Sequence, residues 1–130
     1  MNLSHTLNFM SPAMRPDIKK SVIKALLKYF MIQTPRKTKI NLSYCQVDDN
    51  TVELFVDGMM SDVIQQRIEE LDLSYNYIGD DSCKHLAKLF TANFHFSNLN
   101  IGKNVNITKE GLKSITNSIR GNNFIQTIDF

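Results

Sequence analysis

The sequence predicts an α/β solenoid in which one short strand and one helix recur and stack on a continuous core. Two observations predict it. Apolar–polar–apolar triplets return at intervals of 28–33 residues, and the segments between them carry apolar residues at helical spacing. Stacked units of this kind bury one shared core rather than separate ones.

Each triplet is predicted to be a strand, because two apolar residues that flank a polar one lie on the same face of an extended chain. Residues 40–49 align with 71–81 at an offset of 31, and later copies follow at 28 and 29. A weaker copy at 6–9 precedes them by 33. The apolar pairs are Ile40/Leu42, Leu71/Leu73, Leu99/Ile101 and Ile128/Phe130.

Helices are predicted between the strands, because parallel strands need crossover connections of about a dozen residues or more. Each helical segment follows proline or a residue that favours the N-cap position. The predicted starts and helices are Pro16 before 17–30, residues 48–51 before 52–60, residues 80–82 before 83–90, and Thr108 before 110–119.

The stretches "IEELDLSYNYI" (68–78) and "FSNLNIGKNVNI" (96–107) resemble the leucine-rich repeat family, with its pattern LxxLxLxxNxL, and specifically its ribonuclease-inhibitor-like class. The resemblance covers residues 38–130 well and 1–37 weakly, because Pro12 stands where the asparagine is expected. In style, the short repeats rich in Asn, Lys and Ile also resemble bacterial effectors delivered into host cells. The resemblance implies one domain over 1–130, with a divergent N-terminal repeat or cap (1–38), repeats at 39–67, 68–95 and 96–124, and a truncated final strand (125–130).

Asn76 stands between apolar residues and is predicted to be structural. A short amide can satisfy backbone groups that become buried where the chain turns out of a strand, and each copy can reach its neighbour. Asn104 continues this ladder, and Cys45 occupies the same slot one repeat earlier. Ligand binding or a reactive thiol is the alternative for these three residues, and burial disfavours it.

No catalytic, cofactor or metal site is predicted. Asp81, Ser82 and His85 share a helical surface, but no oxyanion donor or glycine elbow accompanies them. The acidic pairs 48–49 and 80–81 are interpreted as helix N-caps rather than calcium ligands, because calcium needs about six or more oxygen ligands. The two cysteines have no CxxC spacing.

Charge divides the chain unevenly. Residues 1–40 carry eight basic residues and one acid, Asp17, so this third is +7 and the remainder −5 within a net charge of +2. Lys20, Lys24 and Lys28 line one face of the first predicted helix. A membrane surface or an acidic partner could bind such a face, although the polar outer face of a terminal repeat explains it more simply. Nucleic-acid binding is not predicted, because the basic residues stop at position 39 within this region and no aromatic ladder interleaves them.

The function predicted is non-catalytic protein–protein recognition through the concave sheet face. Outward positions of the strands form polar columns down the stack, edged by two aligned tyrosines, a residue type enriched at interaction surfaces. A merely solvated sheet is the alternative. The predicted contact residues are Tyr44, Asp72, Tyr75, Asn100 and Lys103.

Two further expectations concern the surroundings of the protein. The sequence has neither a signal peptide nor an apolar run long enough for a membrane span, so we expect a cytoplasmic protein, or the host cytosol for a delivered effector. Residues 127–130 form a strand with no helix after it. An exposed edge invites pairing, so either self-association through this edge or a longer repeat array is expected.

Overall fold

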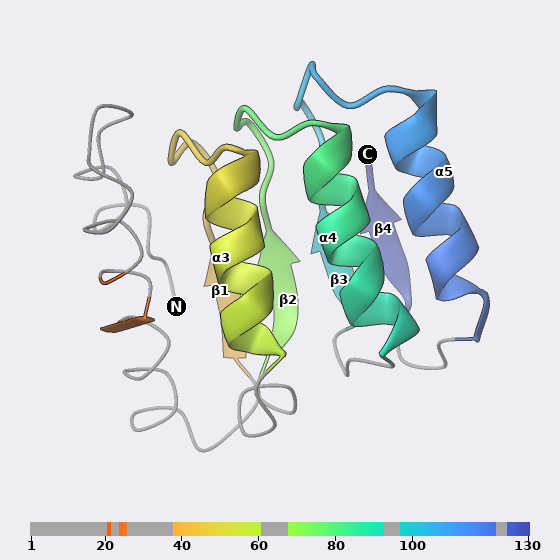
Figure 1. The fold of residues 1–130 in the computed structure, drawn as a ribbon, viewed down its shortest axis with the longest axis horizontal. Coiled ribbons are helices and arrows are strands. Elements are labelled where there is room, and N and C mark those ends of the chain that lie inside the picture. Colours follow the sequence, from red (N-terminus) through yellow and green to blue (C-terminus); the bar gives the residue numbers. More distant parts are fainter. Residues whose placement is uncertain (1–20, 22–23, 26–37, 61–67, 93–96, 122–124) are drawn as a thin grey trace.

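The computed structural model describes residues 21, 24–25, 38–60, 68–92, 97–121 and 125–130. Strands and helices alternate along the chain and form two layers (Figure 1), with the helices packed on one face of a parallel sheet. The elements are β1 (Thr38–Asn41), α3 (Asp49–Met59), β2 (Ile68–Asp72), α4 (Asp80–Thr91), β3 (Asn98–Asn100), α5 (Lys109–Ser118), η1 (Ile119–Gly121) and β4 (Thr127–Asp129).

The strand register confirms the repeat offsets. The sheet order is β1-β2-β3-β4, and every strand pair is parallel. Asn41 is opposite Asp72, which is opposite Asn100 and then Asp129, so the offsets are the predicted 31, 28 and 29 residues. Strands of adjacent repeats therefore stack in register, and equivalent side chains form columns.

The core lies between the sheet and the helices. The predicted apolar pairs of the first three strands are buried together with the apolar sides of α3 and α4. The fourth pair differs. Ile128 is half-buried and Phe130 is 61% exposed, whereas the equivalent Ile101 is 2% exposed. Ile101 is covered by the next strand's segment, since its backbone N–H donates to Asp129 O at 2.8 Å.

Two of the three described helices begin as predicted. The side chain of Asp48 accepts a hydrogen bond from Thr51 N at the start of α3, and that of Thr108 accepts from Glu110 N at the start of α5. The prediction for α4 was wrong, because its N-cap is Gly79 and no side chain caps it from that position. The carboxylate of Asp80 bonds to the following repeat instead.

The N-terminal repeat and the weak strand copy at 6–9 lie outside the described residues. Of the predicted basic face, Lys24 is helical and exposed, while Lys20 and Lys28 also lie outside them. Within the part of the chain that is described, no helix combines the length and apolarity needed to cross a membrane.

Candidate functional site: the sheet face and its loop rim

An asparagine ladder holds the turns that follow the strands. The Oδ1 atom of Asn76 accepts hydrogen bonds from the backbone N–H groups of Cys45 and Val47, both at 3.0 Å. Its Nδ2 donates to the carbonyl oxygens of Leu42 and Leu73, both at 2.9 Å, and to that of Ser74 at 3.1 Å. One buried amide therefore satisfies five backbone groups from two repeats, as the ladder prediction requires.

Asn104 repeats this arrangement one unit later. Its Oδ1 accepts from Asn76 N at 3.0 Å, and its Nδ2 donates to Leu73 O, also at 3.0 Å. Cys45 fills the same slot with a buried thiol that donates to Ser43 O at 3.3 Å. Burial raises the pKa of the Cys45 thiol to about 11, which suppresses the reactive thiolate at neutral pH. The structural interpretation of these three residues is confirmed.

The outward column at the strand ends forms a second set of local turns. Asp72 Oδ1 accepts hydrogen bonds from Ser74 N at 2.9 Å and from Ser74 Oγ at 2.6 Å. In the preceding repeat, Asn41 Oδ1 accepts the equivalent two hydrogen bonds from Ser43. Asn100 Oδ1 accepts from Gly102 N at 2.9 Å. Such turns hold the side chain close to its own backbone, so Asp72 and Asn100 are oriented before any partner arrives.

The face of the sheet opposite the helices, which we call the sheet face, is hollowed. A cavity of about 320 Å³ opens across β2, β3 and β4. Two of the predicted contact residues, Asp72 and Asn100, line it. The other side chains that reach it from outward strand positions are Glu70, Asn98, Thr127 and Asp129.

The turns beyond the strands carry a row of exposed side chains, which we call the loop rim: residues 44, 46, 75, 77, 103 and 105. Tyr44 and Tyr75 stack with ring centroids 4.3 Å apart and an interplanar angle of 12°. Partial burial raises the pKa of the Tyr44 hydroxyl, and the adjacent Tyr75 adds to the shift. The two rings therefore form one aromatic surface that spans two repeats.

The rim backbone is unusual for its residue types. Tyr44, Gln46, Tyr75 and Lys103 have φ between 55° and 58°, a left-handed conformation in which bulky side chains are uncommon. Hydrogen bonds between repeats hold it, among them Tyr44 N to Ser74 O at 3.3 Å and Tyr75 N to Gly102 O at 3.0 Å. The turn geometry thus projects these side chains outward, and Tyr44 is 63% exposed.

The five predicted contact residues therefore fall into two groups. Asp72 and Asn100 lie on the sheet face, and Tyr44, Tyr75 and Lys103 lie on the loop rim. Sequence reasoning missed Tyr77 and Val105, which are 63% and 90% exposed on the same rim. The signal was present in the repeat offsets, because Gln46, Tyr77 and Val105 are separated by 31 and 28 residues.

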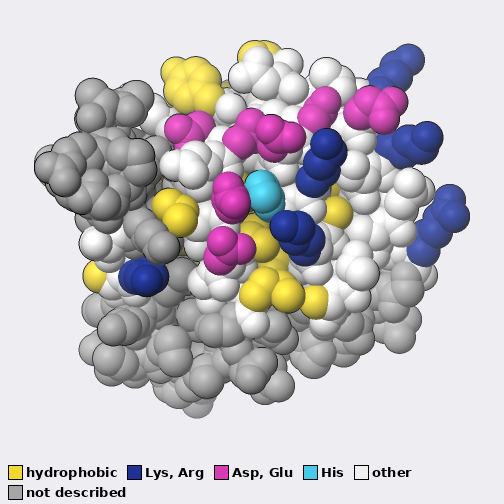
Figure 2. Space-filling model, in the orientation of Figure 1, with side chains coloured by type: hydrophobic (Ala, Val, Ile, Leu, Met, Phe, Trp, Pro, Cys, Tyr) yellow, Lys and Arg dark blue, Asp and Glu magenta, His cyan; other side chains and the backbone are white. Residues whose placement is uncertain are grey.

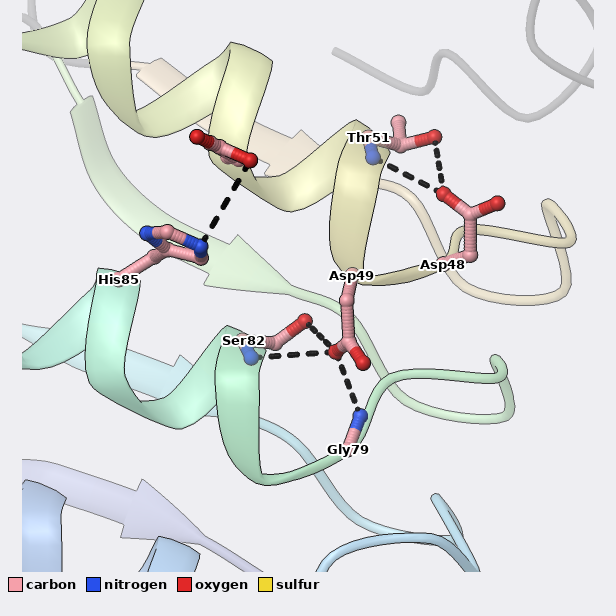
Figure 3. A network of polar contacts seen from close by, with 7 residues as sticks. Asp48, Asp49, Thr51, Gly79, Ser82 and His85 are labelled. Carbon is pink, nitrogen blue, oxygen red and sulfur yellow. Dashed lines mark hydrogen bonds and ion pairs between the residues drawn. The ribbon is translucent and has the colours of Figure 1, made fainter.

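The starts of the helices, which directly follow the rim turns, are connected by a carboxylate network (Figure 3). Asp49 Oδ1 accepts hydrogen bonds from Gly79 N at 2.8 Å, from Ser82 N at 3.1 Å and from Ser82 Oγ. Asp80 occupies the equivalent place one repeat on, where Thr108 N donates to its Oδ1 at 2.8 Å. These aspartates therefore cap the helix of the next repeat rather than their own, which corrects the prediction for Asp49 and Asp80.

This network separates the residues that resemble a triad in sequence. The Ser82 hydroxyl is buried and donates to Asp49, while His85 Nε2 lies 3.9 Å from Glu53 Oε2 on α3. Figure 3 shows the two side chains pointing to different partners. A histidine must hold the nucleophile to act as its base, and this arrangement does not provide that contact.

Charges are spread unevenly over the helical face (Figure 2). Acidic side chains lie on one side of the histidine, and basic ones border its other side, over α4 and α5. Among the described residues, no group of three or more His, Cys, Asp or Glu has the proximity needed to hold a metal ion. Glu53, Asp57 and Asp81 are exposed acids of this face, away from the sheet face.

Comparisons with known proteins agree with this architecture. A family model described as "Leucine Rich repeat" matches residues 67–87 and 92–115. No curated protein matches the chain. A solved structure titled "Leiomodin-1 Actin-Binding Site 2 (ABS2)" is similar over 99% of this chain and 68% of its own, with a TM-score of 0.72 and 15% identity. The chain therefore has the fold of an α/β leucine-rich-repeat solenoid, with its parallel strands on one face and its helices on the other.

Proposed function

We propose that this protein is a non-catalytic protein-binding module that holds its partner on the sheet face and the loop rim. The stacked pair Tyr44 and Tyr75 is the observation that carries the proposal, because two large exposed rings lie on turns whose backbone is already bonded between repeats. Tyrosine is enriched among residues that dominate binding energy. A surface ordered in advance also loses less conformational entropy on binding.

Two further observations support a binding role. The cavity of the sheet face is open and lined mainly by polar side chains, as the rim of an interface commonly is. One solved chain of this fold is titled as an actin-binding site, so a solenoid of this kind serves protein binding elsewhere. The separation of Ser82 from His85 supports the non-catalytic part of the proposal.

The test is affinity capture with matched variants. We expect the wild-type protein to retain specific proteins from its cytosol that the variant Tyr44→Ala/Tyr75→Ala loses. A control variant, Lys84→Ala/Lys88→Ala, changes two exposed residues of α4 on the helical face and should capture the same proteins as the wild type. Equal capture by all three proteins would refute the proposed surface.

Other predictions remain proposals of lower rank. Lys24 is exposed, which is compatible with a basic face that binds anionic membranes through Lys20, Lys24 and Lys28. Flotation with anionic vesicles tests this, because charge reversal of the three lysines should abolish binding. The ribonuclease-inhibitor-like class, a bacterial effector origin and a cytoplasmic location also stay predictions.

Self-association through β4 is favoured by one observation. Phe130 lines two hollows at the end of the stack, of about 130 and 210 Å³, together with Ile101 and Ile128 among others. Light scattering over a range of concentrations tests the proposal. A concentration-dependent increase in mass that Phe130→Ser removes is expected, and a monomer at every concentration would exclude it.

A further inference from the structure

The sheet face carries an excess of negative charge. Its charged side chains among the described outward strand positions are Lys39, Glu70, Asp72 and Asp129. Lys39 Nζ lies 3.7 Å from Glu70 Oε1, so it neutralises one carboxylate. Within the described residues, neither Asp72 nor Asp129 has a lysine or arginine at ion-pair distance.

The cavity concentrates this charge. All three carboxylates line the space of about 320 Å³, and none of its lining residues is basic. Low-dielectric walls around charges of one sign focus the field and favour the opposite sign in a ligand. The cavity is as large as the smaller ligand pockets of proteins, which begin at about 300 Å³.

The acceptors of this cavity are also held in place. Asn98 Nδ2 donates to Glu70 Oε1 at 2.7 Å, and the turn to Ser74 orients Asp72. Glu70 and Asp72 lie on β2 and Asp129 on β4, and the asparagines of β3 lie between them, so a cation entering the cavity meets acceptors from three strands at once. Guanidinium is the side-chain cation best suited to such an array, since its five donors form a planar fork that matches carboxylates.

From this geometry we infer that the sheet face binds a basic segment of its protein partner, with an arginine seated in the cavity between β2 and β4. The inference rests on the proposed binding function and adds the chemistry of the partner. On the loop rim, the stacked pair of Tyr44 and Tyr75 offers aromatic faces on which further guanidinium groups can stack.

The test uses a fluorescent arginine–serine repeat peptide, with lysine–serine and glutamate–serine peptides of equal length as probes. Fluorescence anisotropy should show binding of the arginine peptide that weakens with added salt. The lysine peptide should bind more weakly and the glutamate peptide not at all. No preference for arginine over glutamate would overturn the inference.

Two variants of equal charge change locate the binding. Glu70→Gln/Asp72→Asn/Asp129→Asn keeps the acceptors that bond to Asn98 and Ser74 while it removes three charges. We expect affinity for the arginine peptide to fall at least about tenfold, or about 1.4 kcal/mol. The control, Glu53→Gln/Asp57→Asn/Asp81→Asn, removes three exposed charges from the helical face and should change affinity less than about twofold. Equal loss in both variants would show a non-specific charge effect and refute the site.

Thermal unfolding of both variants checks that they fold. If the sheet-face variant unfolds, Glu70→Gln/Asp129→Asn leaves the Asp72 turn intact and should still lower affinity, and unchanged affinity would count against the inference. The outcome is separable from that of the proposed function. Partner capture that depends on Tyr44 and Tyr75, without any arginine-peptide binding, would keep the binding surface and refute only its basic partner.

Discussion

Two ladders connect the repeats of this solenoid, and they differ in chemistry and in depth. On the turn side, Asn76 and Asn104 are buried and bond only to backbone groups. On the helical side, Asp49 and Asp80 are partly exposed and accept hydrogen bonds at the start of the next helix. A neutral amide suits the first position because it both donates and accepts, and a carboxylate suits the second because it complements the positive end of a helix dipole.

The two ladders differ in how much stability is lost when one of their hydrogen bonds is removed. Groups left unpaired in the core lose their hydration without compensation, whereas water can replace an exposed partner. We therefore expect the asparagine ladder to dominate stability and the aspartate ladder to adjust it.

The largest effect is expected for Asn76→Ala. This change orphans backbone groups such as Cys45 N and Leu42 O, and each buried unpaired group costs about 1–3 kcal/mol. Urea denaturation should show a loss of about 3–5 kcal/mol in the free energy of unfolding, which is at the upper end for a single substitution. Tyr77→Ala, an exposed neighbour, should change the free energy of unfolding by no more than about 0.5 kcal/mol. If Asn76→Ala lowers the free energy of unfolding by less than about 1 kcal/mol, the asparagine ladder does not dominate stability.

An intermediate effect is expected for Gly111→Ala in α5. A Cβ at this position would overlap Asp80 Oδ1 and approach Cys83 Sγ to 3.0 Å. Overpacking of this kind costs about 1–3 kcal/mol, whereas alanine in an unobstructed helix interior gains up to about 1 kcal/mol over glycine. The sign of the change in the free energy of unfolding therefore tests whether the Asp80 carboxylate packs against Gly111 at the start of α5.

Thermal or urea unfolding measures that sign, with Lys113→Ala as the exposed control in the same helix. Combining Gly111→Ala with Asp80→Ala should recover part of the loss, because the two positions are in contact. Stabilisation by Gly111→Ala alone would mean that the aspartate lies away from this helix.

The smallest effect is expected for Asp80→Asn, and it depends on pH. Hydrogen bonds from the Thr108 side chain and backbone lower the pKa of Asp80 below its ordinary value. A carboxylate whose folded pKa is lowered stabilises the protein above its unfolded pKa of about 3.9, and this contribution is lost as the pH falls through the folded pKa.

The free energy of unfolding should be measured between neutral pH and about pH 2, where the carboxylates of unfolded chains are protonated. As the pH is lowered, this free energy should decrease less for Asp80→Asn than for the wild type. Asp81→Asn, one residue further along α4 and exposed, serves as the control and should follow the wild type. If the free energy of unfolding decreases equally at acid pH for Asp80→Asn and the wild type, the Asp80 carboxylate does not contribute to stability through its hydrogen bonds to Thr108.

The positions and register of the strands were predicted more accurately from the sequence than the residues that cap the helices. Strands can be identified from sequence because the alternation of apolar and polar residues lies within one repeat, and the constant offset appears when the repeats are compared with each other. The pair Asp80–Asp81 resembles an ordinary N-cap for its own helix, yet Asp80 bonds to Thr108, 28 residues away. Composition near a helix start reports that a carboxylate is favoured there and does not report which helix it serves.

The candidate surface shows the same division. The alignment of Tyr44 with Tyr75 predicts neighbouring side chains, but their stacking and left-handed backbone depend on hydrogen bonds from the next repeat. Glu70 and Asp129 join Asp72 around one cavity only because three strands lie side by side.

The repeat, the strand register, the apolar columns and the place of the asparagine ladder can all be predicted from the amino-acid sequence, since they follow from local periodicity and copy spacing. The folded chain adds three features: Asp49 and Asp80 reach forward to the next helix, Ser82 is bound away from His85, and the carboxylates of β2 and β4 share one cavity. Stacking chooses the partners of these side chains, because residues one or two repeats away meet there and the sequence around each residue does not specify which of them it contacts.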